Sequence, residues 1–475
     1  CLIQSGGFPV DCYKCKCRHP PLPPSFCCAP GQPSTSKAKR PAGIMRPPKR
    51  SPCKYFPPKL LLLLLAAIHA LTSAFIFNPT LGAIRPKPQA GSKVCHQEGS
   101  PGHTVTGGTS KALSEGRTVA TRARQCSALS MGKAAKDAEV VLRSVKVGPL
   151  KQENVELPSG VSMQMVSQKP STASPKRSKP LPPLVFIHGS YHAAWCWAEH
   201  WMPFLAAKGY ETFSVSLRGT SGTLIPGVEA ETNGEKVKIS DHVGDIRSFA
   251  ETILPDRRPV FVSHSFGGLV LLKLMEELAS EASGGADKEQ GEAEVTGTGM
   301  RAAMAGGAFL CSVPPSGNGP MTKRFIKQRP VMAVKIVLGF VFKMAVYWPW
   351  LARDLFFCQS LEQSALKRYM SCFKADSKNG LDLGDLRGQL PSRKTDGDGR
   401  ATWVQQAPPR LVIGAERDSI VDEAGVKEMA IFLDTEHIML PTVPHEVMLG
   451  PDWPLGAARL LQWLEATDFA VSSTP

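Results

Sequence analysis

Strand-length runs rich in apolar residues alternate with helical segments, and this alternation restricts the fold more than any other feature of the sequence. The runs LVFI, ETFSV and VFVS occupy 184–187, 211–215 and 260–263. Segments with helical spacing precede the second and third runs, at 198–208 and 241–252. Mainly apolar strands are buried on both faces, and strands joined through helices run parallel. We therefore predict an α/β fold with a mostly parallel central sheet and helices on both faces.

Further strands extend this sheet within residues 137–470. AEVVLRSVKV and VSMQMVSQ alternate apolar and polar residues around LPSG, which predicts two strands and a turn. AAMAGGAFLCSV, RLVIGA and HIMLPTV predict three later strands, and a helix is expected at 454–466. The core is therefore assigned to 137–315 and 406–470. A polar, glycine-rich insertion lies at about 281–300.

Charge is distributed unevenly along the chain. Residues 1–180 carry 27 Lys and Arg against seven Asp and Glu, whereas the remainder carries 29 basic and 34 acidic residues. The net charge of +15 therefore comes from the N-terminal region. A basic groove for nucleic acid on the folded part is not expected, and the basic region indicates targeting. The four widely spaced Cys residues after position 180 predict buried free thiols.

An order of segments typical of a secretory signal peptide begins at Met45. A basic stretch is followed by the apolar run LLLLLLAAIHAL at 60–71, and small residues precede Phe75. This pattern predicts a signal peptide at 45–74. We expect translation to begin at Met45 and residues 1–44 to lie outside the native protein.

The next segment, 75–136, has the composition of a transit peptide, being basic, rich in hydroxyl groups and poor in acidic residues. Together with the preceding signal peptide it resembles the bipartite plastid presequence of algae whose plastids have extra bounding membranes. We therefore expect a plastid protein. A protein of the secretory pathway with a basic linker is the alternative.

The sequence VFVSHSFGG joins a predicted strand to a predicted helix and contains a candidate nucleophile, Ser265. It matches the nucleophile elbow G-x-S-x-G, except that Ser263 replaces the first Gly. The elbow is a strained turn whose flanking residues must be small so that the strand and the helix can approach each other. Ser263 and Gly267 meet this requirement.

Three other features follow in the order that a catalytic triad on this kind of sheet requires. The loop HGSYH at 188–192 comes directly after a strand, where a donor for the oxyanion is expected. Asp418 follows the strand LVIGA, and His445 follows the last strand. We predict that Ser265 is the nucleophile, His445 its base and Asp418 the acid. Asp422 is the alternative acid, and Asp434 is less suitable because it precedes the last strand.

These motifs resemble the α/β-hydrolase superfamily of the broad plant and algal type. The pattern His-x-x-x-His-x-x-Trp, formed by His188, His192 and Trp195, is similar to the methylesterase and hydroxynitrile-lyase branch. The resemblance covers about 137–470. It implies that the backbone N–H groups of Ser190 and Phe266 bind the oxyanion.

Other residues near the motifs receive more modest assignments. His188 is expected to be structural, and His264 is expected to support the elbow. His192 and Tyr191 are tentative substrate-pocket residues, although a packed loop histidine is an equal interpretation of His192. The sequence contains no nucleotide-binding fingerprint or paired metal ligands, so we expect neither a cofactor nor a metal.

Residues 316–405 lie where this superfamily inserts a helical cap, and 331–357 is almost wholly apolar. Lys335 and Lys343 would share one polar edge of a continuous helix over 331–348. Three interpretations stay open: a lid packed on the core, a lid that contacts a membrane peripherally, and a membrane span.

We therefore predict a serine hydrolase that cleaves a carboxylic ester or thioester of a hydrophobic acyl substrate, a small molecule, through an acyl-enzyme intermediate. A hydroxynitrile-lyase-like enzyme and an inactive hydrolase-fold binding protein are the alternatives.

Overall fold

The computed structural model describes residues 145, 147–171, 180–228, 234–284 and 298–469. Four predicted segments lie wholly or mostly outside these residues: 1–44, the signal peptide 45–74, the transit-like segment 75–136 and the polar insertion 281–300.

One eight-stranded sheet organises the described residues, in the order β1-β2-β4-β3-β6-β7-β9-β10. Its strands are β1 (Lys151–Glu156), β2 (Ser162–Gln168), β3 (Leu184–Ile187), β4 (Thr212–Val215), β6 (Val260–His264), β7 (Gly306–Leu310), β9 (Arg410–Ala415) and β10 (His437–Leu440). The pairs β1–β2 and β2–β4 are antiparallel, and every other pair in this sheet is parallel. The predicted fold class is therefore confirmed.

The two faces of the sheet bury separate hydrophobic clusters. Along β3, Leu184 and Phe186 enter one cluster, and Val185 and Ile187 enter the other. Successive side chains of a strand point to opposite faces, so a strand buried on both sides must be apolar at every position. This requirement explains the LVFI run.

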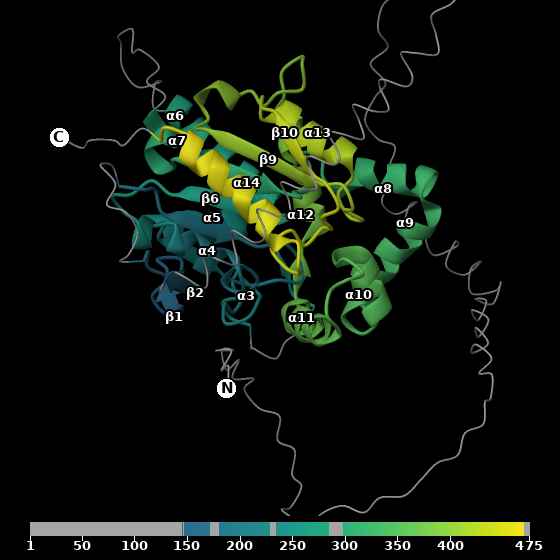
Figure 1. Ribbon diagram of the computed structural model, residues 1–475. Helices are drawn as coiled ribbons and strands as arrows, with labels where there is room; N and C mark the ends of the chain where they lie inside the picture. Colours follow the sequence, from purple (N-terminus) through teal and green to yellow (C-terminus); the bar gives the residue numbers. More distant parts are fainter. Residues whose placement is uncertain (1–144, 146, 172–179, 229–233, 285–297, 470–475) are drawn as a thin grey trace, which may run out of the picture. The chain divides into compact units, whose positions relative to one another are not determined.

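Helices cover both faces of the sheet (Figure 1). The first cluster receives side chains from α3 (Trp195–Ala198), α4 (Trp201–Ala207) and α14 (Trp453–Ala466). The second receives side chains from α5 (Ile239–Ile253), α6 (Gly267–Gly284), α7 (Thr298–Ala303) and α13 (Glu423–Phe432).

A mainly helical insertion separates β7 from β9. Its helices α8 to α11 stand together beside the sheet in Figure 1. The elements of the insertion are α8 (Asn318–Gln328), α9 (Pro330–Ile336), the π-helix η2 (Val337–Val341), the 3-10 helix η3 (Met344–Val346), α10 (Pro349–Phe356), α11 (Gln363–Asp376), α12 (Leu383–Gly388) and the 3-10 helices η4 (Pro391–Arg393) and η5 (Val404–Gln406). A two-residue strand, β8 (Gly380–Leu381), pairs with β5 (Lys236–Val237).

One local prediction was wrong, and another lies mostly outside the described residues. The first strand of the sheet is KQENVE at 151–156, whereas the predicted strand AEVVLRSVKV lies mostly outside the described residues. The run 331–348 is not one helix, because α9 passes into a π-helix and Lys343 adopts a left-handed φ of 53°. Lys335 and Lys343 therefore do not share a helix edge. No helix among the described residues is long and apolar enough to cross a membrane.

Candidate active site

Ser265 occupies the tight turn between β6 and α6. Its φ is 52°, in the left-handed region that a residue with a Cβ rarely adopts. Two hydrogen bonds hold the turn, from the Ser265 N–H to the Leu310 carbonyl at 3.1 Å and from the Gly268 N–H to the Ser265 carbonyl at 3.1 Å. Such strain persists only where the surrounding structure enforces it, and it projects the Ser265 hydroxyl from the end of the strand.

Two glycines allow the loop after β3 to lie against this turn. A Cβ on Gly189 would lie 2.7 Å from the Ser265 Cβ, and a Cβ on Gly267 would lie 2.6 Å from the His188 carbonyl oxygen. Neither position has room for a side chain. Gly189 therefore lies directly against Ser265, and Ser190 and Phe266 are the residues that follow these two in the sequence. The role of their N–H groups as oxyanion donors stays a prediction.

The structure brings together the three residues of the predicted triad. His445 Nε2 lies 3.1 Å from Ser265 Oγ, and His445 Nδ1 lies 2.8 Å from Asp418 Oδ2. The other oxygen of Asp418 accepts the N–H groups of Ile420 and Val421 at 2.7 and 2.9 Å. Asp418 is thus fixed by its own loop while it holds Nδ1 of the imidazole, which leaves Nε2 facing the serine.

The electrostatic environment favours a proton on His445. Burial alone would lower the pKa of His445, but the charge and hydrogen bond of Asp418, followed by the charge of Glu446, raise it above the ordinary value. An imidazolium at this position is therefore stabilised by two carboxylates.

The alternative acids are placed elsewhere. Asp422 caps the N-terminus of α13 and forms a bidentate ion pair with Arg324, at 2.6 and 2.7 Å. Asp434 is exposed in the turn after α13. Only Asp418 among these three carboxylates contacts His445 in the described residues.

Sequence reasoning missed Glu446, a carboxylate that is only 1% exposed and directly follows His445. Its Oε2 lies 3.0 Å from His192 Nε2, and neither of its oxygens has a hydrogen bond of good geometry within the described residues. Burial alone would raise the pKa of Glu446, but His192 holds it below the ordinary value. A glutamate within the apolar sequence PHEVML was the available signal.

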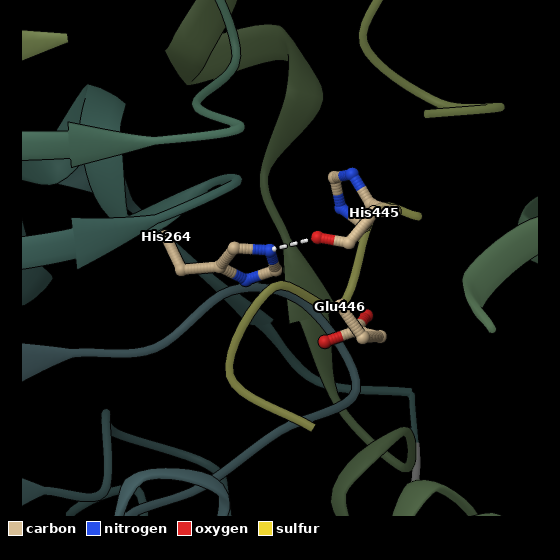
Figure 2. Close-up of side chains that lie close together, drawn as sticks. All are labelled: His264, His445 and Glu446. Carbon is tan, nitrogen blue, oxygen red and sulfur yellow. Dashed lines mark hydrogen bonds between the residues drawn. The ribbon is translucent and has the colours of Figure 1, made fainter. Parts of the chain in front are cut away.

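Two further histidines connect the loops that carry the triad. His264 Nε2 lies 3.0 Å from the carbonyl oxygen of His445, and Figure 2 shows the His445 ring pointing away from this contact. Burial lowers the pKa of His264 to about 3, so the ring is neutral and donates to that carbonyl. His192 Nδ1 lies 2.7 Å from the Ser190 carbonyl, and its Nε2 faces Glu446. His264 therefore links the turn of Ser265 to the loop of His445. His192 links the loop 188–192, where the oxyanion donor is predicted and which we name the oxyanion loop, to Glu446.

His188 has the structural role expected of it. Its Nε2 accepts the Leu217 N–H at 2.9 Å, and its Nδ1 lies 2.7 Å from the Gly189 carbonyl. Burial lowers the pKa of His188 to about 3, so the ring is neutral, as this pair of contacts requires. For His192, the structure favours the packed loop histidine over a pocket residue, because its buried ring has Nδ1 against the Ser190 carbonyl and Nε2 facing the Glu446 carboxylate.

An aromatic cluster lies beside His445, whose ring centroid is 6.4 Å from that of Phe356. Tyr191 donates its hydroxyl proton toward the carbonyl oxygens of Gly339 and Phe340 in the insertion, at 3.2 and 2.9 Å. Its ring packs against Phe340, Phe356 and Phe373. Ser265 is 7% exposed and His445 is 2% exposed, so the insertion and the oxyanion loop close the site. Cavities of about 510 and 160 Å³ lie elsewhere and are lined by neither residue of this pair.

Two groups of side chains in this region have the composition of a metal site. One consists of His264, His445 and Glu446, and the other of Cys311, Asp418 and His445. In both, His445 already has its two nitrogens against Ser265 and Asp418. The four cysteines that follow position 180 form no disulfide within the described residues; Cys196 and Cys311 are buried, and Cys358 and Cys372 are partly buried.

Plant proteins of similar sequence match part of the chain. Methylesterase 10 of Arabidopsis thaliana is 32% identical over 105 residues, which are 21% of this chain and 34% of that protein. Norfluorocurarine synthase 1 of Strychnos nux-vomica is 28% identical over 99 residues, 21% of this chain and 35% of that protein. The match thus spans about a third of the length of these relatives.

Among solved structures, potato (Solanum tuberosum) epoxide hydrolase I aligns with 67% of this chain and 100% of its own, at 16% identity and a TM-score of 0.45. The model of the alpha/beta hydrolase family matches residues 184–453, more than half of the chain. The resemblance predicted from the motifs is confirmed, and the chain belongs to the alpha/beta hydrolase family.

Proposed function

We propose that the protein is a serine hydrolase that cleaves a carboxylic ester or thioester through an acyl-enzyme intermediate. The observation that carries the proposal is the continuous contact from Ser265 through His445 to Asp418, at 3.1 and 2.8 Å. A serine hydroxyl is a weak nucleophile until an adjacent base accepts its proton, and a third group must orient that base.

The reaction follows from these contacts in two halves. His445 Nε2 accepts the Ser265 proton as Oγ bonds to the acyl carbon, and the carbonyl oxygen becomes an oxyanion facing the N–H groups of Ser190 and Phe266. The tetrahedral adduct collapses, and the leaving alcohol or thiol takes the proton from His445. Water then attacks the acyl-enzyme, with the same histidine as base, and releases the acid and free Ser265.

Asp418 keeps Nδ1 protonated and stabilises the imidazolium in both halves. The carboxylate of Glu446, although it does not touch Ser265, adds to the negative potential at His445.

The surroundings of the site support an apolar acyl group. Tyr191, Phe340, Phe356 and Phe373 form one aromatic cluster, and the Phe356 and His445 ring centroids lie 6.4 Å apart. Similarity to methylesterases supports a small alcohol as the leaving group. We therefore include methyl esters of hydrophobic acids in the proposed substrate class.

Covalent labelling tests the proposal directly. A fluorophosphonate probe should label Ser265, and Ser265→Ala and His445→Ala should each abolish labelling and lower ester hydrolysis by several orders of magnitude. Ser240→Ala, at an exposed position of α5, is the matched control and should keep full labelling. Labelling of folded Ser265→Ala protein at the wild-type level would overturn the assignment.

A further inference from the structure

Large apolar side chains are exposed in one short part of the insertion, Pro330–Trp350, which we name the apolar segment. Of the eight exposed large apolar residues in the described part of the chain, five lie here: Val331 (70%), Val341 (53%), Phe342 (50%), Tyr347 (56%) and Trp350 (46%). Soluble proteins rarely concentrate exposed apolar groups without a binding role.

The insertion around this segment is strongly basic. Residues 316–378 contain eleven Lys and Arg and three Asp and Glu, a net charge of +8. Three of these bases are neutralised in ion pairs: Arg324 with Asp422, Lys335 with Asp354 and Arg368 with Glu199.

Other bases next to the apolar segment remain available. Lys323, Lys327 and Arg329 are exposed in and just after α8, and they pair with no carboxylate among the described residues. Lys374 lies over the Tyr347 ring at 5.2 Å. Lys343, by contrast, donates to the carbonyls of Ser377 and Lys378.

We propose that the apolar segment is a docking surface for an anionic lipid bilayer. Exposed Phe and Val supply apolar area, and Trp and Tyr prefer the level of the lipid headgroups. Neighbouring Lys and Arg side chains are attracted to an anionic surface. Charge complementarity thus favours a bilayer over an apolar protein partner, and none of these steps depends on the proposed hydrolase activity.

The apolar segment and the neighbouring helix α10 also contact loops of the active site. Phe340 packs on Tyr191 of the oxyanion loop at a centroid distance of 5.2 Å, while the next two residues, Val341 and Phe342, are exposed. The Phe356 carbonyl accepts the Glu446 N–H at 3.2 Å, which ties α10 to the loop that carries the catalytic base. Docking would therefore act on residues that close the site. This consequence, unlike docking itself, rests on the proposed function.

Hydrogen exchange on the full chain tests docking of the apolar segment. Because the exchange rate is measured for each peptide separately, any membrane affinity of the N-terminal region can be told apart from it. Vesicles of phosphatidylcholine with phosphatidylglycerol should slow exchange in peptides covering 330–350. Peptides around Leu383 and Ile431, which are also exposed apolar residues, should not change. Vesicles of pure phosphatidylcholine should slow exchange in the 330–350 peptides much less. Equal protection by both vesicles, or none in 330–350, would overturn the proposal.

Vesicle co-sedimentation of variants gives the second measurement. Val341→Ser combined with Phe342→Ser should weaken association at least about tenfold, because about 0.8 kcal/mol is lost per buried CH₂ and 1.4 kcal/mol is a factor of ten. Leu383→Ser combined with Ile431→Ser is the matched control and should bind as wild type does. Weakening by both pairs alike would contradict a localised surface.

Charge reversal tests the electrostatic contribution. Lys327→Glu combined with Arg329→Glu should weaken association at least about tenfold at low salt and less at high salt. Lys169→Glu combined with Lys236→Glu, two exposed bases outside the insertion, should change it little. No difference between the two pairs would overturn the assignment to anionic lipid.

Two further readouts separate docking from catalysis and from self-association. Ser265→Ala should dock as wild type does, because the docking surface does not include Ser265. If the wild-type protein docked but hydrolysed no ester, the enzyme would be refuted and the docking surface kept. Analytical ultracentrifugation should show that the protein does not form a dimer through the apolar segment. A dimer that is lost when Val341→Ser and Phe342→Ser are combined would contradict this. Such a dimer, without vesicle protection, would assign the segment to a second copy of this chain instead.

Discussion

Replacing Gly189 by Ala tests how closely the oxyanion loop must approach the nucleophile. The new Cβ would lie 2.7 Å from the Ser265 Cβ and 3.2 Å from both Nδ1 and the carbonyl oxygen of His264. All three neighbours belong to the nucleophile turn. That turn is held by hydrogen bonds to Leu310 and Gly268, so it cannot yield cheaply.

The size of the effect follows from this geometry. Ordinary contact between the two Cβ atoms requires 3.4–4 Å, so the loop and the turn must separate by about 0.7–1.3 Å. Misplacement of a catalytic group by about 1 Å can reduce the rate about 100-fold. Overpacking should also lower the free energy of unfolding by about 1–3 kcal/mol. Gly189→Ala should therefore remain folded with kcat/KM reduced about 30- to 100-fold.

Ester hydrolysis and thermal unfolding of the same preparation provide the assay. Gly244→Ala is the matched control, because this glycine lies within α5 and a Cβ there would meet no atom within 4 Å. That control should keep wild-type kcat/KM and gain up to about 1 kcal/mol of stability. If Gly189→Ala kept wild-type kcat/KM, contact between the oxyanion loop and Ser265 would have no catalytic importance.

Three further predictions concern the acid, the pH profile and targeting. Asp418→Asn should lower kcat by about 10⁴-fold and Asp422→Asn by less than about tenfold, and the reverse order in steady-state kinetics would make Asp422 the acid. In the proposed mechanism His445 must be neutral to accept a proton, so activity is lost as the pH falls through the raised pKa of His445. The charge of Glu446 is one cause of that raised pKa. Glu446→Gln should therefore move the acid limb of the kcat/KM profile to lower pH. If the acid limb of folded Glu446→Gln protein stayed at the same pH or moved to higher pH, Glu446 would not raise the pKa of His445. Residues 45–136 fused to a fluorescent protein should enter an algal plastid, whereas accumulation in the medium would indicate secretion.

The sequence alone determined the architecture and the order of the chemical groups. LVFI predicts a doubly buried strand because each of its positions must be apolar, and SHSFG predicts the turn because only small residues fit beside it. The expected order of Ser265, Asp418 and His445 depends only on which strand each residue follows. These are local properties, readable from a few neighbouring residues.

Only the tertiary structure decided which distant side chains meet. Asp418 and Asp422 are four residues apart, and local sequence does not show that one reaches His445 while the other pairs with Arg324. The approach of His192 to Glu446 joins positions more than 250 residues apart, and no local pattern specifies such a contact. Likewise, the apolar run 331–348 was expected to form one helix. Packing against the core instead placed Gly339 against Leu355, where a Cβ would lie 2.3 Å from Cδ1, and the segment is a π-helix there. Long-range packing overrides local preference, because burial gains from distant contacts exceed the small differences between local backbone conformations.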